Sequence, residues 1–375
     1  MKYIASLAVA LAVGMAPAHA QDVYKIGASL GLSGYIASID SPWKDGAALA
    51  IESVNKAGGV LGKKLELVPE DMRSEPAEAV TVARKLINSD KVIAMVNGCS
   101  SAGNAAMAPL VARAEVPMML CSILPPKKED HKWAFAYIPP PAFDVEIRLA
   151  YLKKVGTTKA GVVYDASPYA GMQKRVFEEL APKYGVTIAG QEQNKTTDAD
   201  MTAYITKLHA AGADVIVKMG SGSDTITAAK AIKQLGLPLA LIASTVDMNL
   251  VKGSVEALGT KFMFPAQRTQ ILDLLPKDDR SLKSTQEFMV LWTAKYGDRD
   301  PTWAARGWDA VQTIVAAIRK ANSAEGAKVR EAIENNLSLS GASGEFTFTA
   351  DEHLGVRTNP YALATMVDGK IALVK

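Results

Sequence analysis

The chain has 375 residues and a formal net charge of +3 at pH 7, and 22% of its residues are charged. This length is typical of two domains. No run of basic residues is longer than two, so we expect no nucleic-acid partner. After residue 20 no apolar run approaches the roughly 20 residues that a membrane-spanning helix needs.

The first twenty residues have the pattern of a cleaved secretory signal peptide. Lys2 supplies a positive charge, residues 4–16 form a short apolar stretch, and Ala18-His19-Ala20 is a small-x-small cleavage site. The apolar stretch is too short to span a membrane, and no cysteine follows it that could carry a lipid. We therefore predict that residues 1–20 are removed and that the protein is free in the periplasm and is not a lipoprotein.

Short apolar strands then alternate with amphipathic helices. In the first half of the chain we expect strands over 23–31, 63–71, 91–98 and 116–122, and helices over 41–59, 75–90 and 101–115. The first of these helices is predicted to have Ser41 as its N-cap, Pro42 at its first helical position and Gly58 at its end.

The second half repeats this alternation and changes after residue 265. We expect strands over 159–167, 186–193, 213–223 and 237–245, helices over 169–185, 200–212 and 224–236, then helices near 281–296, 302–320 and 326–336, and last a pair of strands over 344–350 and 361–374. Apolar strands separated by helices are typical of parallel sheets covered on both faces. The predicted fold class is therefore α/β, with two doubly wound, Rossmann-like lobes. The proline-rich segment 137–144 suits a crossing between them.

The sequence lacks the patterns of an enzyme. It contains no H-E-x-x-H, C-x-x-C, G-x-S-x-G or phosphate-binding glycine loop, and His131, His209 and His353 are isolated. We therefore expect no catalytic residues, no metal and no cofactor. Cys99 and Cys121 each end a predicted strand, and either a disulfide or two buried thiols would fit.

Polar residues instead follow the predicted strands, at the edge where doubly wound sheets bind ligands. They are Ser29–Ser33, Ser100 and Ser122 in the first lobe, and Asp165–Tyr169, Lys218–Ser223 and Thr245–Asp247 in the second. Helix N-termini at the same edge bring unpaired N–H groups and a positive dipole end. Two such edges that face each other would clamp a carboxylate without any reaction.

Four segments carry a more specific pattern: IGASLGLSG, GAALAIESVNKAGGVLGKKLELVPED, VVYDASPYAGM and WDAVQTIVAAI. They resemble the branched-chain amino acid-type (Leu/Ile/Val-binding protein) family of periplasmic substrate-binding proteins of ABC transporters, and the resemblance covers nearly the whole chain after residue 20. It implies a type I Venus-flytrap fold, in which two lobes joined by three crossovers close on a small molecule and deliver it to an inner-membrane ABC permease.

The resemblance also implies the division of the chain and its assembly. We expect lobe 1 to comprise residues 22–141 plus 269–346, and lobe 2 to comprise residues 142–268 plus 347–375. The partners expected are a small-molecule organic acid or amino acid and the permease, and the protein is expected to be a monomer.

Ligand-binding positions follow from the same resemblance. In amino-acid-binding members a serine after the third strand holds the ligand carboxylate, and Ser100 stands there. The next strand ends in Ser122 and Ile123, whose N–H groups are further donors. Tyr169 stands where a tyrosine lines the second lobe, and Thr245 replaces the acidic residue that pairs with a ligand ammonium.

Three further residues are candidates from the sequence itself. Lys218 ends an apolar strand and is either a cation for the ligand or a solvated lysine. Trp43 either stacks on a ligand ring or belongs to the core, and Arg268 faces either the cleft or solvent. The predicted ligand-binding set is Trp43, Ser100, Ser101, Ser122, Ile123, Tyr169, Lys218, Ser221, Thr245, Asp247 and Arg268.

Thr245 decides the expected ligand. A buried ammonium without a carboxylate partner is unfavourable, unless Asp247 takes that role. We therefore expect a small organic carboxylate, with an aromatic or other ring-bearing acid favoured. The alternatives are a branched-chain or other amino acid or an amide for the same kind of importer, and a periplasmic ligand-sensing module.

Overall fold

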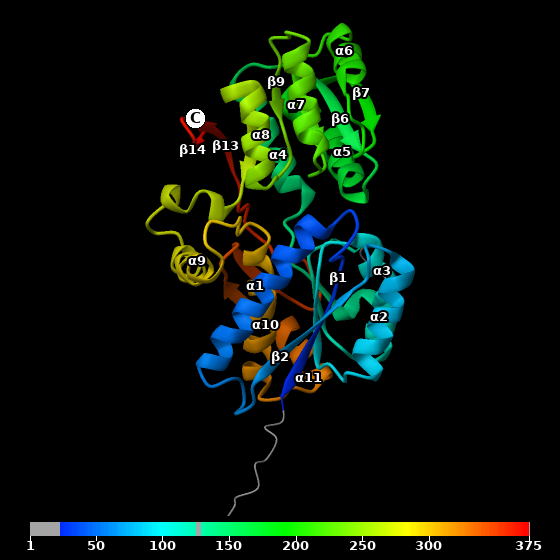
Figure 1. The fold of residues 1–375 in the computed structure, drawn as a ribbon, viewed down its shortest axis with the longest axis vertical. Coiled ribbons are helices and arrows are strands. Elements are labelled where there is room, and N and C mark those ends of the chain that lie inside the picture. Colours follow the sequence, from blue (N-terminus) through cyan, green and yellow to red (C-terminus); the bar gives the residue numbers. More distant parts are fainter. Residues whose placement is uncertain (1–22, 125–128, 375) are drawn as a thin grey trace, which may run out of the picture.

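The computed structural model describes residues 23–124 and 129–374, and the predicted signal peptide lies outside this range. Two lobes stand one above the other along the longest axis (Figure 1). None of the described helices is long and apolar enough to cross a membrane.

Lobe 1 is built, within the described residues, on a five-stranded parallel sheet of order β2-β1-β3-β4-β5. Its strands are β1 (Tyr24–Leu30), β2 (Leu65–Asp71), β3 (Ala94–Asn97), β4 (Met118–Leu120) and β5 (Ala134–Ala136). Helix α1 (Ala37–Lys56) covers one face together with a late helix, α10 (Ala304–Ala321), and α2 (Pro76–Asn88) and α3 (Ser101–Arg113) cover the other.

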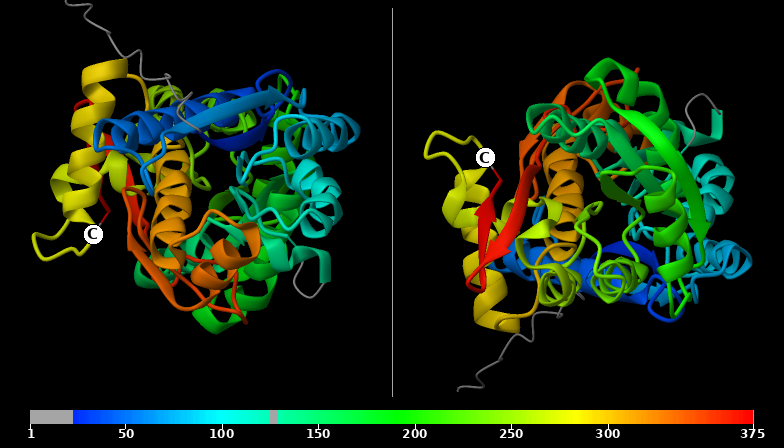
Figure 2. Two further views of the ribbon diagram at one scale, coloured as in Figure 1. Left: turned by 90° about the horizontal axis from the view of Figure 1, so that it is seen from below. Right: turned by 90° about the horizontal axis from the view of Figure 1, so that it is seen from above.

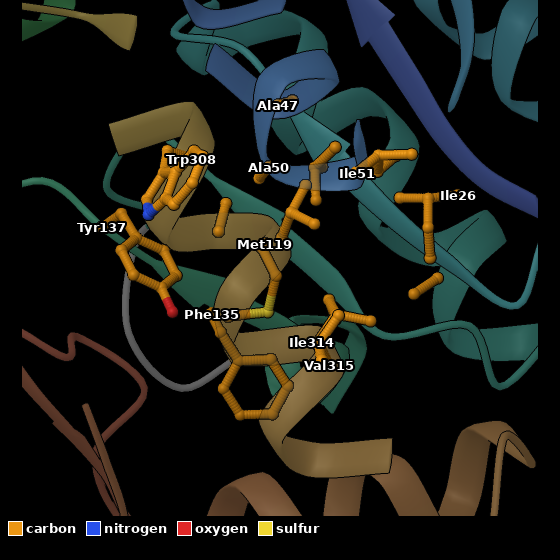
Figure 3. Close-up of a cluster of buried hydrophobic side chains, with 14 of the residues drawn as sticks. Ile26, Ala47, Ala50, Ile51, Met119, Phe135, Tyr137, Trp308, Ile314 and Val315 are labelled. Carbon is orange, nitrogen blue, oxygen red and sulfur yellow. The ribbon is translucent and has the colours of Figure 1, made fainter. Parts of the chain in front are cut away.

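The core between this sheet and the helices α1 and α10 joins distant parts of the chain. Ile26 of β1, Ala50 of α1, Met119 of β4 and Ile314 of α10 all point into it (Figure 3). The alternation of the strands sends neighbouring residues such as Met118 to the opposite face. Both faces of the sheet are therefore buried, as continuous apolar strands predict.

Lobe 2 has a seven-stranded sheet of order β14-β13-β10-β9-β8-β6-β7 in the described chain. Its strands are β6 (Lys159–Asp165), β7 (Thr187–Asn194), β8 (Val215–Met219), β9 (Ala240–Ile242), β10 (Phe262–Ala266), β13 (Ala362–Val367) and β14 (Lys370–Leu373). The last two run antiparallel at one edge (red in Figure 2). Helices α4 (Pro141–Lys154) and α5 (Pro168–Leu180) cover one face, and α6 (Thr202–Ala210), α7 (Asp224–Gln234) and α8 (Met248–Leu258) cover the other.

The segment after β10 returns to lobe 1. It contains α9 (Leu282–Tyr296), α10, α11 (Gly326–Glu334) and the ribbon of β11 (Leu337–Ser340) with β12 (Glu345–Phe348). Phe288, Val329 and Phe346 from this segment belong to the same core as Ile26. Short 3₁₀ helices lie at Glu129–Trp133, Ala181–Tyr184, Gly259–Lys261, Arg268–Gln270 and Leu272–Leu274.

The chain thus crosses between the lobes three times: between β5 and α4, after β10, and between β12 and β13. The predicted α/β class, with two doubly wound lobes and three crossovers, is confirmed. The boundaries at residues 141, 268 and 346 stay a prediction.

The predicted start of the first helix is wrong. Helix α1 begins at Ala37 rather than after Ser41, and Pro42 lies inside it. The extra turn is held by tertiary contacts, because the carboxylate of Asp40 accepts hydrogen bonds from the backbone N–H groups of Gly31 and Cys99. A proline in the second turn removes one hydrogen bond, and these contacts offset that loss.

Candidate ligand-binding cleft

A cleft of about 520 Å³ lies between the two lobes. Lobe 1 lines it with the loop after β1, the loop after β3 and the residues after β4. Lobe 2 lines it with the ends of β6, β7 and β8 and with the segment before α8. The lining residues are Tyr35, Ile36, Ser38, Ile39, Cys99, Ser101, Ala102, Cys121, Ser122, Ile123, Ile138, Asp165, Ser167, Pro168, Tyr169, Met172, Thr196, Thr197, Ser221, Gly222, Ser223, Thr245, Asp247, Asn249, Leu250 and Trp303.

The lobe 1 side presents hydrogen-bond donors. Ser100 is the N-cap of α3, and its hydroxyl accepts a hydrogen bond from the N–H of Gly103 at 3.2 Å. The next two residues, Ser101 and Ala102, line the cleft, and N–H groups at these first helical positions have no acceptor within the helix. Such N–H groups at a helix N-terminus are a site for an anion.

Ser122 adds a side-chain donor to this edge. Its hydroxyl oxygen accepts a hydrogen bond from Asn104 Nδ2 at 2.9 Å, and the same nitrogen donates to the carbonyl of Gly98 at 2.9 Å. Because the oxygen is already an acceptor, the hydroxyl hydrogen is available to a ligand. Asn104, Gly98 and Ser122 are all buried, so buried hydrogen bonds hold the Ser122 hydroxyl in place.

Cys99 and Cys121 form a disulfide that lines the cleft. This decides between the two possibilities that the sequence left open. The bond joins the loop after β3 to the residues that follow β4, next to Ser100 and Ser122 respectively.

Asp40 holds two of the lobe 1 loops together. Its carboxylate, which is completely buried, accepts from the N–H groups of Gly31 and Cys99, each at 2.8 Å. Burial raises the pKa of Asp40 to about 7. A side chain at position 98 would collide with this carboxylate, since a Cβ there would lie 2.2 Å from its carbon, so glycine is required.

On the lobe 2 side, Lys218 is not available to a ligand. Its side chain is completely buried, with Nζ 2.8 Å from the Asp224 carboxylate and 3.4 Å from that of Asp165, and it donates to the carbonyl of Met219 at 2.6 Å. The sequence led us to consider a cation for the ligand, but two carboxylates already neutralise this charge. Of Lys218, Asp165 and Asp224, only Asp165 lines the cleft.

A second buried ion pair lies behind Thr245. Asp144 and Arg148, one turn apart on α4, form it with both side chains completely buried. The backbone N–H of Thr245 donates to Asp144 at 3.1 Å, and Ser244 donates to the same oxygen at 2.9 Å. Thr245 also hydrogen-bonds Tyr361. The end of β9 is therefore fixed by buried charges that do not face the ligand.

Tyr169 and Asp247 complete the lobe 2 wall. Burial raises the pKa of Tyr169 well above its ordinary value, so its hydroxyl remains neutral. Asp247 is the N-cap of α8 and accepts from the N–H groups of Asn249 at 2.8 Å and Leu250 at 3.0 Å. Burial, with a further contribution from the nearby Asp300, raises the pKa of Asp247.

Two other predicted residues lie away from the cleft. Trp43 is completely buried in the core of lobe 1 and donates to the carbonyl of Val96 at 3.4 Å. Arg268 forms a two-point ion pair with Asp279. Both sequence readings that placed them against a ligand are therefore wrong, because each side chain finds its partner within the protein.

The predicted set thus separates into two groups. Ser101, Ser122, Ile123, Tyr169, Ser221, Thr245 and Asp247 line the cleft, whereas Trp43, Ser100, Lys218 and Arg268 do not. The hydroxyl of Ser100 is used as the helix cap, so it supports the donors of the next residues from behind.

Sequence reasoning missed several lining residues. Thr196 and Thr197 follow β7, so the rule that ligands lie beyond strand ends would have found them. Tyr35 lies only two residues beyond the segment that was predicted. Trp303 comes from the start of α10, and no local pattern marks it. Its ring is covered by the guanidinium of Arg306 at 5.1 Å.

The charge of the cleft limits its chemistry. Among the described residues, no lysine, arginine or histidine lines it. The acidic residues that do, Asp165 and Asp247, already accept from Lys218 and from the α8 N–H groups. An anion would therefore meet neutral donors on lobe 1, whereas lobe 2 lines the cleft with neutral polar side chains, the carboxylates of Asp165 and Asp247, and apolar residues.

Comparison with known proteins agrees with this architecture. The family model described as periplasmic binding protein matches residues 23–370. The chain therefore belongs to the periplasmic binding protein family, as a type I member of the Leu/Ile/Val-binding kind. Proteins of this family and fold bind solutes and are not enzymes.

Individual relatives are distant but extend over most of the chain. Leu/Ile/Val-binding protein homolog 3 of Brucella melitensis is 24% identical and covers 99% of this chain and 98% of its own. A leucine-, isoleucine-, valine-, threonine- and alanine-binding protein of Pseudomonas aeruginosa is 25% identical, with 84% and 83% covered. The structure of a branched-chain amino acid transporter substrate-binding protein of Streptococcus pneumoniae, in complex with isoleucine, matches with a TM-score of 0.80 at 25% identity, covering 93% of this chain and 98% of that one.

Proposed function

We propose that this chain is the solute-binding component of an ABC importer in the periplasm, and that its cleft binds a small ligand through a carboxylate. The observation that carries the proposal is the row of neutral donors on lobe 1. Ser101, Ala102 and Ser122 line the cleft together, and a bound carboxylate accepts hydrogen bonds from such groups without a basic side chain.

The apolar part of the lining supports an apolar ligand body. Six aliphatic or thioether side chains and three rings border the cleft: Ile36, Ile39, Ile123, Ile138, Met172, Leu250, Tyr35, Tyr169 and Trp303. Ligand sites of this kind combine an apolar wall with a few placed polar groups. We therefore favour an aromatic or other ring-bearing acid.

A branched-chain amino acid is the second candidate. Asp247 lines the cleft and would accept an ammonium if its side chain turned away from the α8 N–H groups. The names of the relatives support this alternative. The cost is the loss of two capping hydrogen bonds, at 2.8 and 3.0 Å, which is why we place it second.

A ligand panel separates the two candidates. Benzoate, 4-hydroxybenzoate, hexanoate, leucine, isoleucine and valine are tested by thermal shift and then by titration calorimetry. A ligand at a hundredfold excess over its Kd stabilises the folded protein by about 2.7 kcal/mol. We expect this response with a ring-bearing acid. Tight binding of leucine or valine without affinity for the acids would contradict the preferred ligand, and no binding of any carboxylate would contradict the proposal itself.

The role of the lobe 1 donors is tested by Ser122→Ala. Removal of one hydrogen bond to a charged group costs about 1–3 kcal/mol, so the Kd should rise roughly tenfold. Asn104 keeps its other hydrogen bond, to the carbonyl of Gly98, so the fold should tolerate the change. Ser338→Ala, at an exposed serine of β11, is the matched control and should leave the Kd unchanged.

The proposed transport role requires an inner-membrane permease that accepts the loaded protein. We propose that the monomer delivers its ligand to this permease through the rims of both lobes, after signal-peptide cleavage behind Ala20. N-terminal sequencing of the periplasmic protein tests the cleavage. Uptake of the radiolabelled panel ligand that binds, by cells with and without the protein, tests delivery, and equal uptake would contradict it.

A further inference from the structure

We propose that the Cys99–Cys121 disulfide is part of the ligand-binding surface and fixes the spacing of the two donor segments, so that ligand affinity depends on this bond. The inference rests on the proposed function and names a further residue pair that determines binding. Breaking the bond should weaken ligand binding beyond any loss of fold stability.

The position of the disulfide supports this role. Both cysteines line the cleft, and Cys99 is partly exposed, whereas Cys121 is 1% exposed. Cys99 directly precedes Ser100, the cap of α3, and Cys121 directly precedes Ser122. The covalent bond therefore joins the two segments that carry the donors, at the point where they meet the cleft.

Backbone pairing does not reach these segments. Strands β3 and β4 are paired in parallel up to Asn97 and Leu120, and the chain beyond each of them is irregular. The disulfide is the next link beyond the last pair. A reduced protein would hold the two segments by side-chain hydrogen bonds alone, chiefly the one from Asn104 to Ser122 at 2.9 Å.

One of the two joined segments is also anchored to the first helix. Asp40 accepts from the N–H of Cys99 and from that of Gly31 at the end of β1. Asp40 thereby connects the loops after β1 and β3, and the disulfide connects the loop after β3 to the residues after β4. Preorganised donors bind an anion better because less order is lost on binding.

The sulfur atoms also suit an apolar ligand. A ligand held by its carboxylate at Ser101 and Ser122 would lie close to the disulfide, because Cys121 directly precedes Ser122, Cys99 is two residues before Ser101, and both cysteines line the cleft. Divalent sulfur is polarizable and makes favourable contacts with aromatic rings. A bound ligand should therefore cover the accessible side of the disulfide.

Ligand protection is the first test. Dithiothreitol donates two electrons and two protons, its own thiols forming a cyclic disulfide while the Cys99–Cys121 bond opens to two thiols. The native protein is incubated with dithiothreitol, quenched with iodoacetamide and weighed by mass spectrometry. The probe is whichever of benzoate and leucine gives the larger thermal shift. A saturating probe should slow reduction at least fivefold, and equal rates would overturn the proposal.

Affinity after loss of the bond is the second test. The double variant Cys99→Ser, Cys121→Ser should raise the Kd of the probe at least tenfold. Ile314→Val, a completely buried residue of the lobe 1 core, controls for lost stability because it leaves the cleft unchanged. Both variants should have a lower unfolding temperature. If the disulfide served stability alone, the Kd would stay unchanged in the cysteine double variant as it does in Ile314→Val, and that result would overturn the proposal.

A third measurement needs no ligand, so it separates this inference from the proposed function. Amide hydrogen exchange is compared in the oxidised and reduced protein. Residues 99–103 and 121–124 should exchange at least tenfold faster after reduction, while β1 and β2 keep their rates. Unchanged exchange in the two segments overturns the inference. Failure of every probe to bind the oxidised protein contradicts the proposed function instead.

Discussion

At the scale of single residues, the lobe 2 side of the cleft depends on charges that a ligand does not meet. Lys218 lies between Asp165 and Asp224 with no exposed surface. Removal of one member of a buried ion pair leaves an uncompensated charge, which costs more than the pair contributes. We therefore assign Lys218 to the stability of the fold rather than to ligand binding.

Lys218→Met tests this assignment. The free energy of unfolding, measured by urea titration, should fall by about 3–5 kcal/mol because two carboxylates lose their cation. Lys207→Met is the control, since its ion pair with Glu192 at 3.2 Å is on the surface; a change of about 0.5 kcal/mol or less is expected there. Equal effects of the two substitutions would contradict the assignment.

Ser100→Ala should act on stability first. Loss of a serine N-cap costs about 0.5–2 kcal/mol, because the N–H of Gly103 loses its acceptor. Thr81→Ala offers a comparison within a neighbouring helix: its exposed hydroxyl only donates to the carbonyl of Ala77, and little change is expected. Thermal unfolding of both variants gives the answer, and an unchanged Ser100→Ala protein would show that the cap is not needed.

Asp309 should give the protein a measurable dependence of stability on pH. Its completely buried carboxylate accepts from the N–H groups of Ala342 and Ser343, and burial raises its pKa from 3.8 to about 6. Between these values the folded state binds more protons than the unfolded state, so stability falls as pH rises through this window. The contribution is about 3 kcal/mol over roughly two pH units.

Asp309→Asn removes this titration. Relative to wild type, the variant should gain free energy of unfolding as the pH is raised from 4 to 7, because only the wild type must bury a charge. Urea titrations of both proteins across this range measure the difference, in which all other titrations cancel. A difference that does not change with pH would refute the role of Asp309.

At the scale of elements, α1 and α10 are packed unusually closely. A Cβ at Gly46 would lie 1.9 Å from the carbonyl oxygen of Ala304, and one at Gly307 would lie 2.1 Å from that of Trp43. The two helices therefore touch through their backbones, which no larger residue allows. This contact joins the beginning of the lobe 1 chain to the segment that returns after β10.

Gly307→Ala is expected to destabilise the protein by about 1–3 kcal/mol, or more if the helices separate. Gly171→Ala in α5 is the matched control, since nothing lies within 4 Å of its Cβ position. That substitution should be neutral or stabilise by up to about 1 kcal/mol. The unfolding temperature should fall for Gly307→Ala and stay the same or rise for Gly171→Ala, and an equal fall in both would argue against the backbone contact.

At the scale of the whole molecule, the proposed function requires the two lobes to move relative to each other about the three crossovers. Polar contacts join the lobes in addition to the chain itself: Asp300, from the segment before α10, accepts from the N–H of Met248 at 2.6 Å, and Arg306 donates to Gln267 at 2.7 Å. Met248 lies between Asp247 and Asn249, which line the cleft, so a rotation of the lobes should change its contact with Asp300. Hinge closure around a ligand is an established mode of domain movement.

Small-angle X-ray scattering tests the closure. We expect the radius of gyration to decrease when benzoate, or leucine if that binds instead, saturates the protein, and we expect the mass of a monomer throughout. The scattering of the protein with a non-binding member of the panel is the control. An unchanged radius with a saturating ligand would contradict the predicted closure.

The sequence by itself determined the α/β class, the alternation of most helices and strands, and the edge of the sheets where the site lies, but it did not mark α4, α8, β5, β10 or β11. These properties depend on local patterns, since hydrophobic periodicity marks each element and strand ends mark the edge. Seven of the predicted side chains reach the cleft for that reason: Ser101, Ser122, Ile123, Tyr169, Ser221, Thr245 and Asp247.

Only the tertiary structure decided which partner each buried group finds. Lys218 and Arg268 are paired with carboxylates, Trp43 lies in the core, and Cys99 is bonded to Cys121. Each outcome depends on residues distant in the sequence that the fold brings together. Local sequence patterns do not reveal which of these residues are close in space. Charge pairing and disulfide formation depend on separation in space rather than along the chain.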